Sequence, residues 1–261
     1  MKLPFYWIDA FTDRVFHGNP AGVVPLPHWP EDALMQRIAF QHGLAETAFF
    51  VRTGPDRAKL RWFTPKVEVD LCGHATLATA AVMFRHLGQA GEAVRFETAS
   101  GLLTVTRQGE RLELDFPARP AESVPVPADL GPALGAIPAS VRRTERLWLC
   151  VYDRAETVAQ LQPDQAALAR IKPGRFIVTA PGADCDFVSR FFAPDAGIPE
   201  DPVTGSAHCT LLPYWAGRLK RNSLHARQIS PRGGELWCEL AGDRVRIAGH
   251  AALYMRGEIS V

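Results

Sequence analysis

The chain has little cysteine, no excess of charge of either sign and no long apolar run. Its five cysteines are an odd number without CxxC spacing, which favours reduced thiols in a cytoplasmic protein over a disulfide framework. Lys plus Arg is 29 and Asp plus Glu is 28, so nucleic acid is not expected as a partner. No uncharged apolar run approaches the roughly 18 residues that a membrane helix requires. We therefore predict a soluble protein with no membrane partner.

Several common catalytic motifs are also missing. The sequence has no GxGxxG, no P-loop and no GxSxG. The pair His208-Cys209 has no partner at metal-ligand spacing, so no metal site is predicted there. Cys150, Cys185, Cys209 and Cys238 lie in apolar or strand-like runs and are predicted to be buried thiols.

Two stretches of the chain share one plan. The runs Arg61–Leu87 and Arg190–Leu211 each contain a strand end, a proline turn, a glycine at a helix start and a helix of small residues. A shift of about 129 positions superposes them without a gap. The matched pairs are Phe63 with Phe192, Pro65 with Pro194, Val69 with Ile198, Cys72 with Asp201 and Ala78 with Ala207. We interpret the chain as an internal duplication.

Proline is plentiful between the two copies. Six prolines fall between Pro117 and Pro138 with little hydrophobic periodicity, which predicts a stiff linker over residues 119–138. The expected domains are residues 1–118 and 139–261, and the last strand is allowed to pair back onto the first half. The predicted fold class is α+β, with two pseudo-symmetric halves that each hold a central helix within antiparallel strands.

The two helix starts are candidate anion sites. At a helix N-terminus the first backbone N–H groups lack partners and the helix dipole favours negative charge. Gly73-His74 and Gly205-Ser206 would each admit a ligand near the backbone, and the duplication would let them face each other across a cleft. The expected ligand is a carboxylate or an enolate beside one. For either glycine alone, relief of crowding where strand meets helix is the better explanation; the paired occurrence favours binding.

Glu46 is the candidate acid/base residue. It lies where a helix end passes into the apolar strand that begins at Thr47. A desolvated carboxylate keeps its proton to higher pH, as a general acid or base near neutrality requires. An isolated Glu at a strand start would more simply be a surface residue.

Five motifs, in this order and spacing, resemble the PhzF family of phenazine-biosynthesis-like isomerases over nearly the whole chain. They are Asp9-Ala10-Phe11-Thr12, Gly18-Asn19-Pro20-Ala21, Ala45-Glu46-Thr47-Ala48-Phe49, Leu71-Cys72-Gly73-His74-Ala75-Thr76 and Glu200-Asp201-Pro202-Val203-Thr204-Gly205-Ser206-Ala207. The resemblance implies the diaminopimelate epimerase fold, an active site in the cleft between halves, no cofactor and a homodimer.

The same resemblance implies the roles of the site residues. Glu46, His74 and Asp201 match the catalytic positions, whereas Gly73, Gly205 and Ser206 match the carboxylate-binding helix starts. Asn19 matches a site-lining residue, and Cys72 lies at the first helix start. The implied reaction is an isomerisation that moves a proton on a small carboxylate-bearing substrate, with Glu46 as the carrier.

Two alternatives remain open. Related epimerases use one thiol from each half, whereas here Cys72 is matched by Asp201. A two-thiol racemase is therefore disfavoured, but Cys72 acting with Asp201 or Glu46 would give an epimerase. The pKa of Cys72 would then be lowered at the helix N-terminus; a small residue that packs well is slightly favoured. The second alternative is a non-catalytic protein of the same fold that binds a carboxylate ligand or a protein.

Overall fold

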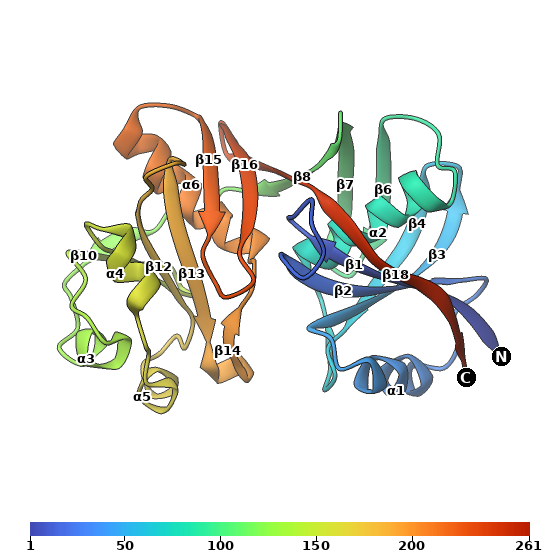
Figure 1. The fold of residues 1–261 in the computed structure, drawn as a ribbon, viewed down its shortest axis with the longest axis horizontal. Helices are drawn as coiled ribbons and strands as arrows, with labels where there is room; N and C mark the ends of the chain where they lie inside the picture. The colour runs from blue at the N-terminus through green and yellow to red at the C-terminus, as the bar shows by residue number, and fades with distance from the viewer. The chain divides into compact units, whose positions relative to one another are not determined.

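The computed structural model describes all residues, 1–261, and divides them into two compact units (Figure 1). Unit 1 comprises Met1–Asp115 together with Ala248–Val261, and unit 2 comprises Phe116–Ile247. The division differs from the expected 1–118 and 139–261 because residues 119–138 belong to unit 2. The C-terminal strand belongs to unit 1 and pairs with β1, as the sequence allowed. No helix combines the length and the apolar character needed to cross a membrane.

Unit 1 is one mixed sheet with a helix on each face. Its strands are β1 (Lys2–Ala10), β2 (Asn19–Leu26), β3 (Glu46–Gly54), β4 (Arg57–Phe63), β5 (Glu68–Val69), β6 (Ala93–Thr98), β7 (Gly101–Gln108), β8 (Arg111–Pro117) and β18 (Ala251–Ser260). They pair in the order β18-β1-β2-β3-β4-β6-β7-β8, and β5 adds to β4. The pairs β2–β3 and β4–β6 are parallel, so the sheet is mixed where antiparallel strands were expected. Each parallel pair is joined through a helix, as a crossover requires.

The central helix of unit 1 is α2 (Gly73–His86), which contacts β1, β2, β3, β7 and β18 (Figure 1). Every residue from His74 to Phe84 is buried. Alanine at positions 75, 78, 80 and 81 lets the strands approach the helix from several sides. The other face is covered by α1 (Asp32–His42), which ends at Gly43 in the left-handed conformation that glycine favours.

Unit 2 repeats this plan. Its strands are β9 (Glu122–Val124), β10 (Ser140–Arg143), β11 (Trp148–Val151), β12 (Phe176–Pro181), β13 (Phe187–Ala193), β14 (Ile198–Asp201), β15 (Ser223–Gln228), β16 (Gly234–Ala241) and β17 (Arg244–Gly249). The order is β9-β10-β11-β12-β13-β15-β16, with β14 added to β13. The parallel pairs β11–β12 and β13–β15 occupy the places of β2–β3 and β4–β6. Its central helix is α6 (Gly205–Leu219), and the short helices are α3 (Leu130–Leu134), α4 (Ala155–Gln160), α5 (Gln165–Arg170) and the 3₁₀ turn η1 (Pro194–Ala196).

The proline-rich segment is part of the folded unit. It contains β9 and α3, and the apolar side chains of α3 are buried in the core of unit 2. Burial of those side chains holds the segment against the unit, whereas polyproline geometry alone predicts a spacer. Helix α6 continues through Pro213 without a break. A proline cannot bond the carbonyl four residues earlier, and here Arg119 N–H donates to that Cys209 carbonyl at 2.8 Å.

The duplication is confirmed in its strand order, but the ungapped shift fails at the helices. Helix α2 starts after the N-cap Cys72, and α6 starts after the N-cap Thr204. Three more residues therefore separate the second Pro turn from its helix, and the N-cap that corresponds to Cys72 is Thr204, not Asp201. Asp201 instead ends β14, with Pro202 and Val203 before the N-cap. The second half still presents no thiol at its N-cap.

Candidate active site

Three of the predicted residues form one cluster in unit 1. Ligand atoms of Glu46, Cys72 and His74 all lie within 4.8 Å of one another. Glu46 is the first residue of β3, whereas Cys72 and His74 lie at the start of α2. The side chains are mostly buried, with exposed fractions of 14% for Glu46 and 7% for His74.

The imidazole of His74 lies between the thiol and the carboxylate. Its Nδ1 is 3.5 Å from Cys72 Sγ. Its Nε2 is 3.2 Å from Glu46 Oε2, which is within hydrogen-bonding distance but not aligned for a hydrogen bond. Burial lowers the pKa of His74 to about 4, opposed by hydrogen bonding to the Pro20 backbone. The ring is therefore neutral near pH 7, and its contact with Glu46 is not an ion pair at that pH.

Strand β2 brings the N-terminal turn to this cluster. Its second residue, Pro20, bonds to His74, and its third, Ala21, pairs with Glu46 in the parallel β2–β3 ladder. Asn19, at the head of the strand, is fully buried. Gly18 before it has φ +64, and a Cβ there would collide with the Ala10 carbonyl. The turn therefore needs glycine at position 18 to start β2 beside Glu46 and His74.

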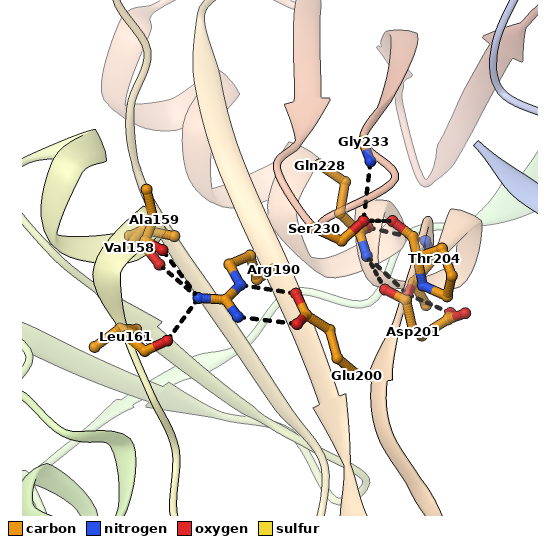
Figure 2. A network of polar contacts seen from close by, with 11 residues as sticks. Val158, Ala159, Leu161, Arg190, Glu200, Asp201, Thr204, Gln228, Ser230 and Gly233 are labelled. Carbon is orange, nitrogen blue, oxygen red and sulfur yellow. Dashed lines mark hydrogen bonds and ion pairs between the residues drawn. The ribbon is translucent and has the colours of Figure 1, made fainter. Parts of the chain in front are cut away.

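The remaining predicted residues lie in unit 2: Asp201 ends β14, whereas Gly205 and Ser206 begin α6. Figure 2 shows Asp201 beside the N-cap Thr204. Thr204 Oγ1 donates to Asp201 Oδ2 at 2.5 Å, so the N-cap hydroxyl is directed to the carboxylate. The N-cap side chain makes no hydrogen bond to the first turn of α6, and the same holds for Cys72 and α2. Ser206 is exposed.

A polar frame that the sequence did not reveal holds this helix start (Figure 2). Gln228, the last residue of β15, accepts from Thr204 N at 2.9 Å and donates to the Asp201 carbonyl at 2.7 Å. Ser230 Oγ donates to the Pro202 carbonyl at 2.8 Å and accepts from Gly233 N at 3.1 Å. These bonds fix the backbone from 201 to 204. No local pattern marks Gln228, because it reaches this backbone only through strand pairing.

A buried ion pair lies beside the frame on the preceding strand (Figure 2). Arg190 binds both carboxylate oxygens of Glu200, at 2.7 and 2.9 Å. Its remaining nitrogen donates to the carbonyls of Val158, which lies in helix α4, and of Leu161, the C-cap of that helix. Glu200 immediately precedes Asp201, so this pair anchors β14 to α4. Glu200, the charged neighbour of Asp201 in the motif, therefore has a structural role, because its carboxylate is bound to Arg190.

The other four cysteines lie outside the Glu46–Cys72–His74 cluster. Cys150, Cys209 and Cys238 are buried as predicted, whereas Cys185 is half-buried at the turn before β13. Burial raises the pKa of Cys209 to about 11 and that of Cys185 to about 11. Their thiols therefore stay protonated near pH 7.

Comparison with known proteins identifies the family. The family model described as phenazine biosynthesis-like protein, PhzC-PhzF, matches residues 8–257. An uncharacterized isomerase of Pseudomonas aeruginosa is 53% identical over 259 residues, covering 99% of both chains. The crystal structure of a PhzF-family phenazine biosynthesis protein of Enterococcus faecalis aligns with a TM-score of 0.98 at 46% identity, covering 100% of both chains.

A more distant likeness extends to the epimerases. A hydroxyproline epimerase of Agrobacterium vitis has a TM-score of 0.64 at 12% identity, covering 99% of this chain and 92% of its own. At that identity the likeness shows the shared fold alone, and it confirms the predicted epimerase-like α+β class. The family match and the named isomerase relatives identify the present chain: it belongs to the PhzC-PhzF family of phenazine biosynthesis-like proteins and is an isomerase of that family.

Proposed function

We propose that this isomerase moves a proton between two carbons of a small carboxylate-bearing substrate, with Glu46 as the proton carrier. The observation that carries the proposal is the 3.2 Å contact between Glu46 Oε2 and Nε2 of the neutral His74 ring, at the N-terminal end of α2. A mostly buried carboxylate near a neutral partner suits reversible proton transfer.

Removal of a proton next to an unsaturated or carbonyl system leaves a delocalised anion. Glu46 takes the proton and returns it at the second carbon, so the substrate is isomerised without net change in atoms. The N–H groups of the first turn of α2, which begins at Gly73, stabilise negative charge as it develops, because the N-cap side chain makes no hydrogen bond to them. We assign the substrate carboxylate to helix-start donors of this kind; Gly205 and Ser206 are the proposed carboxylate-binding residues of unit 2.

His74, Asn19 and Cys72 complete the proposed site in unit 1, and Asp201 is the proposed catalytic residue of unit 2. His74, held neutral, positions the Glu46 carboxylate and offers a ring nitrogen to the substrate. The Asp201 carboxylate is fixed by Thr204 and provides a second polar group for proton transfer. Asn19 and Cys72 line the site in unit 1. No cofactor is invoked, and we propose a cytoplasmic homodimer, which size-exclusion chromatography with light scattering would test.

Carbon-bound deuterium measures the proposed reaction directly. The protein is incubated in D₂O with a panel of 2-hydroxy, 2-amino and β,γ-unsaturated carboxylic acids, and each is followed by ¹H NMR. We expect enzyme-dependent deuteration of at least one acid, lost in Glu46→Gln and kept in Glu68→Gln, a carboxylate bound to Arg61 on the surface. Deuteration unchanged by Glu46→Gln would refute the assigned role.

An epimerase that uses Cys72 is the second candidate, and the 3.5 Å contact of its sulfur with His74 Nδ1 favours it. In that case deuterium enters a stereocentre and the enantiomers interconvert, which chiral chromatography detects. Cys72→Ala would then abolish exchange, whereas the leading proposal expects the variant to retain it.

A further inference from the structure

The acid/base cluster of unit 1 also has the composition of a metal site. Glu46 offers a carboxylate oxygen, His74 a ring nitrogen and Cys72 a sulfur, all within 4.8 Å of one another. Nitrogen and sulfur donors together are typical of zinc and its soft relatives, whereas magnesium and calcium prefer oxygen alone. The three side chains come from two elements in direct contact, α2 and β3, so the fold itself brings them together.

The distances fit tetrahedral zinc on the side of the thiol. Zinc lies about 2.3 Å from sulfur and about 2.0 Å from nitrogen, so a tetrahedral angle separates these two donors by about 3.5 Å. The observed separation of Cys72 Sγ and His74 Nδ1 is 3.5 Å. The separation of this pair therefore matches the spacing of two zinc donors.

Glu46 is the donor that must move. It faces Nε2, whereas the zinc would occupy the opposite ring nitrogen. One ligand atom of each residue already lies within 4.8 Å of the others, so a change of the Glu46 side-chain rotamer is the movement that the three-donor set requires. Glu46 is also the most exposed residue of the cluster.

We propose that Cys72, His74 and Glu46 bind one zinc-like divalent cation, and that the cation inhibits the enzyme. Three protein donors leave a fourth position open. Binding releases the thiol proton of Cys72 to solvent, and the resulting thiolate forms the metal–sulfur bond. The inhibition rests on the proposed function, because the cation binds the carboxylate that carries the proton. The metal site itself does not depend on the proposed function.

Cadmium and cobalt report the site optically. Chelator-treated protein is titrated with Cd²⁺ and, separately, Co²⁺, and the thiolate-to-metal charge-transfer absorption is recorded. We expect a band that saturates at one equivalent, disappears in Cys72→Ser and survives in Cys185→Ser, the half-buried thiol of unit 2. Glu46→Gln should weaken binding by roughly tenfold or more. Circular dichroism checks folding, and His74→Gln replaces Cys72→Ser if that variant unfolds.

Three results would overturn the site: no band with stoichiometric cation, a band that survives Cys72→Ser, or an affinity indifferent to Glu46→Gln. Proton exchange is measured separately on chelated protein with and without Zn²⁺. Metal binding without any proton exchange would support the metal site and refute the proposed function. Proton exchange without metal binding would support the proposed function and refute the metal site. Exchange unaffected by saturating Zn²⁺ refutes the inhibition.

Discussion

His208 should make the protein unstable in mild acid. It lies in the first turn of α6, is fully buried, and has its Nδ1 3.0 Å from the Thr204 carbonyl oxygen. Burial lowers its pKa to about 4 from an ordinary value of 6.5. The unfolded chain therefore takes up a proton below about pH 6.5 that the folded chain refuses until about pH 4. Stability falls as the pH drops through this window.

The size of the effect follows from the two pKa values. Between about pH 7.5 and pH 5, one such histidine contributes a loss of about 2 kcal/mol, and the slope approaches about 1.4 kcal/mol per pH unit. His208→Gln removes the titrating group while keeping a side chain of similar length. The stability difference between wild type and variant should therefore shrink by about 2 kcal/mol over this range.

Urea denaturation at a series of pH values measures this difference. The free energy of unfolding of wild type, His208→Gln and His28→Gln is compared, with the exposed His28 as the control. We expect the free energy of unfolding of His208→Gln to depend less steeply on pH, by the uptake of one proton on unfolding, and that of the control to follow wild type. Parallel curves for wild type and His208→Gln would refute the reasoning.

Two further variants test the frame around the α6 start. Gln228→Ala leaves Thr204 N–H and the Asp201 carbonyl without their partner, at a cost of about 1–3 kcal/mol in stability. It should speed amide hydrogen exchange at Thr204 relative to the exposed control Gln108→Ala. Unchanged exchange would show that the Gln228 bond does not hold the backbone. Glu200→Gln should cost about 3 kcal/mol by thermal or urea unfolding, because it leaves the Arg190 charge buried. Glu68→Gln, which breaks a similar but more exposed pair with Arg61, should cost under about 1 kcal/mol. Equal losses for the two would contradict the role of burial.

The sequence predicts local structure well where the signal is local. The end of α1 at Gly43 and the two helix starts follow from glycine and periodicity, and the duplicated strand order follows from matched motifs. The offset between Cys72 and Thr204 was missed because the ungapped shift is anchored in the strands, whereas the loop before α6 is longer.

The grouping of side chains depends on strand pairing, which the sequence does not display. Glu46 meets His74 because β3 lies parallel to β2 and both border α2. Gln228 meets Thr204 because β15 lies beside β13. The proline-rich segment was assigned to a linker because its composition resembles one; its few apolar side chains, including Leu130 and Leu134, decide its place in the core.

Deuterium exchange on Glu46→Gln and Cys72→Ala, measured side by side on the same acid in D₂O, tests the central claim most directly. We expect Glu46→Gln to abolish incorporation at carbon and Cys72→Ala to retain it, with both variants folded by circular dichroism. Full exchange in Glu46→Gln together with its loss in Cys72→Ala would assign the proton transfer to the thiol and exclude Glu46 as the carrier.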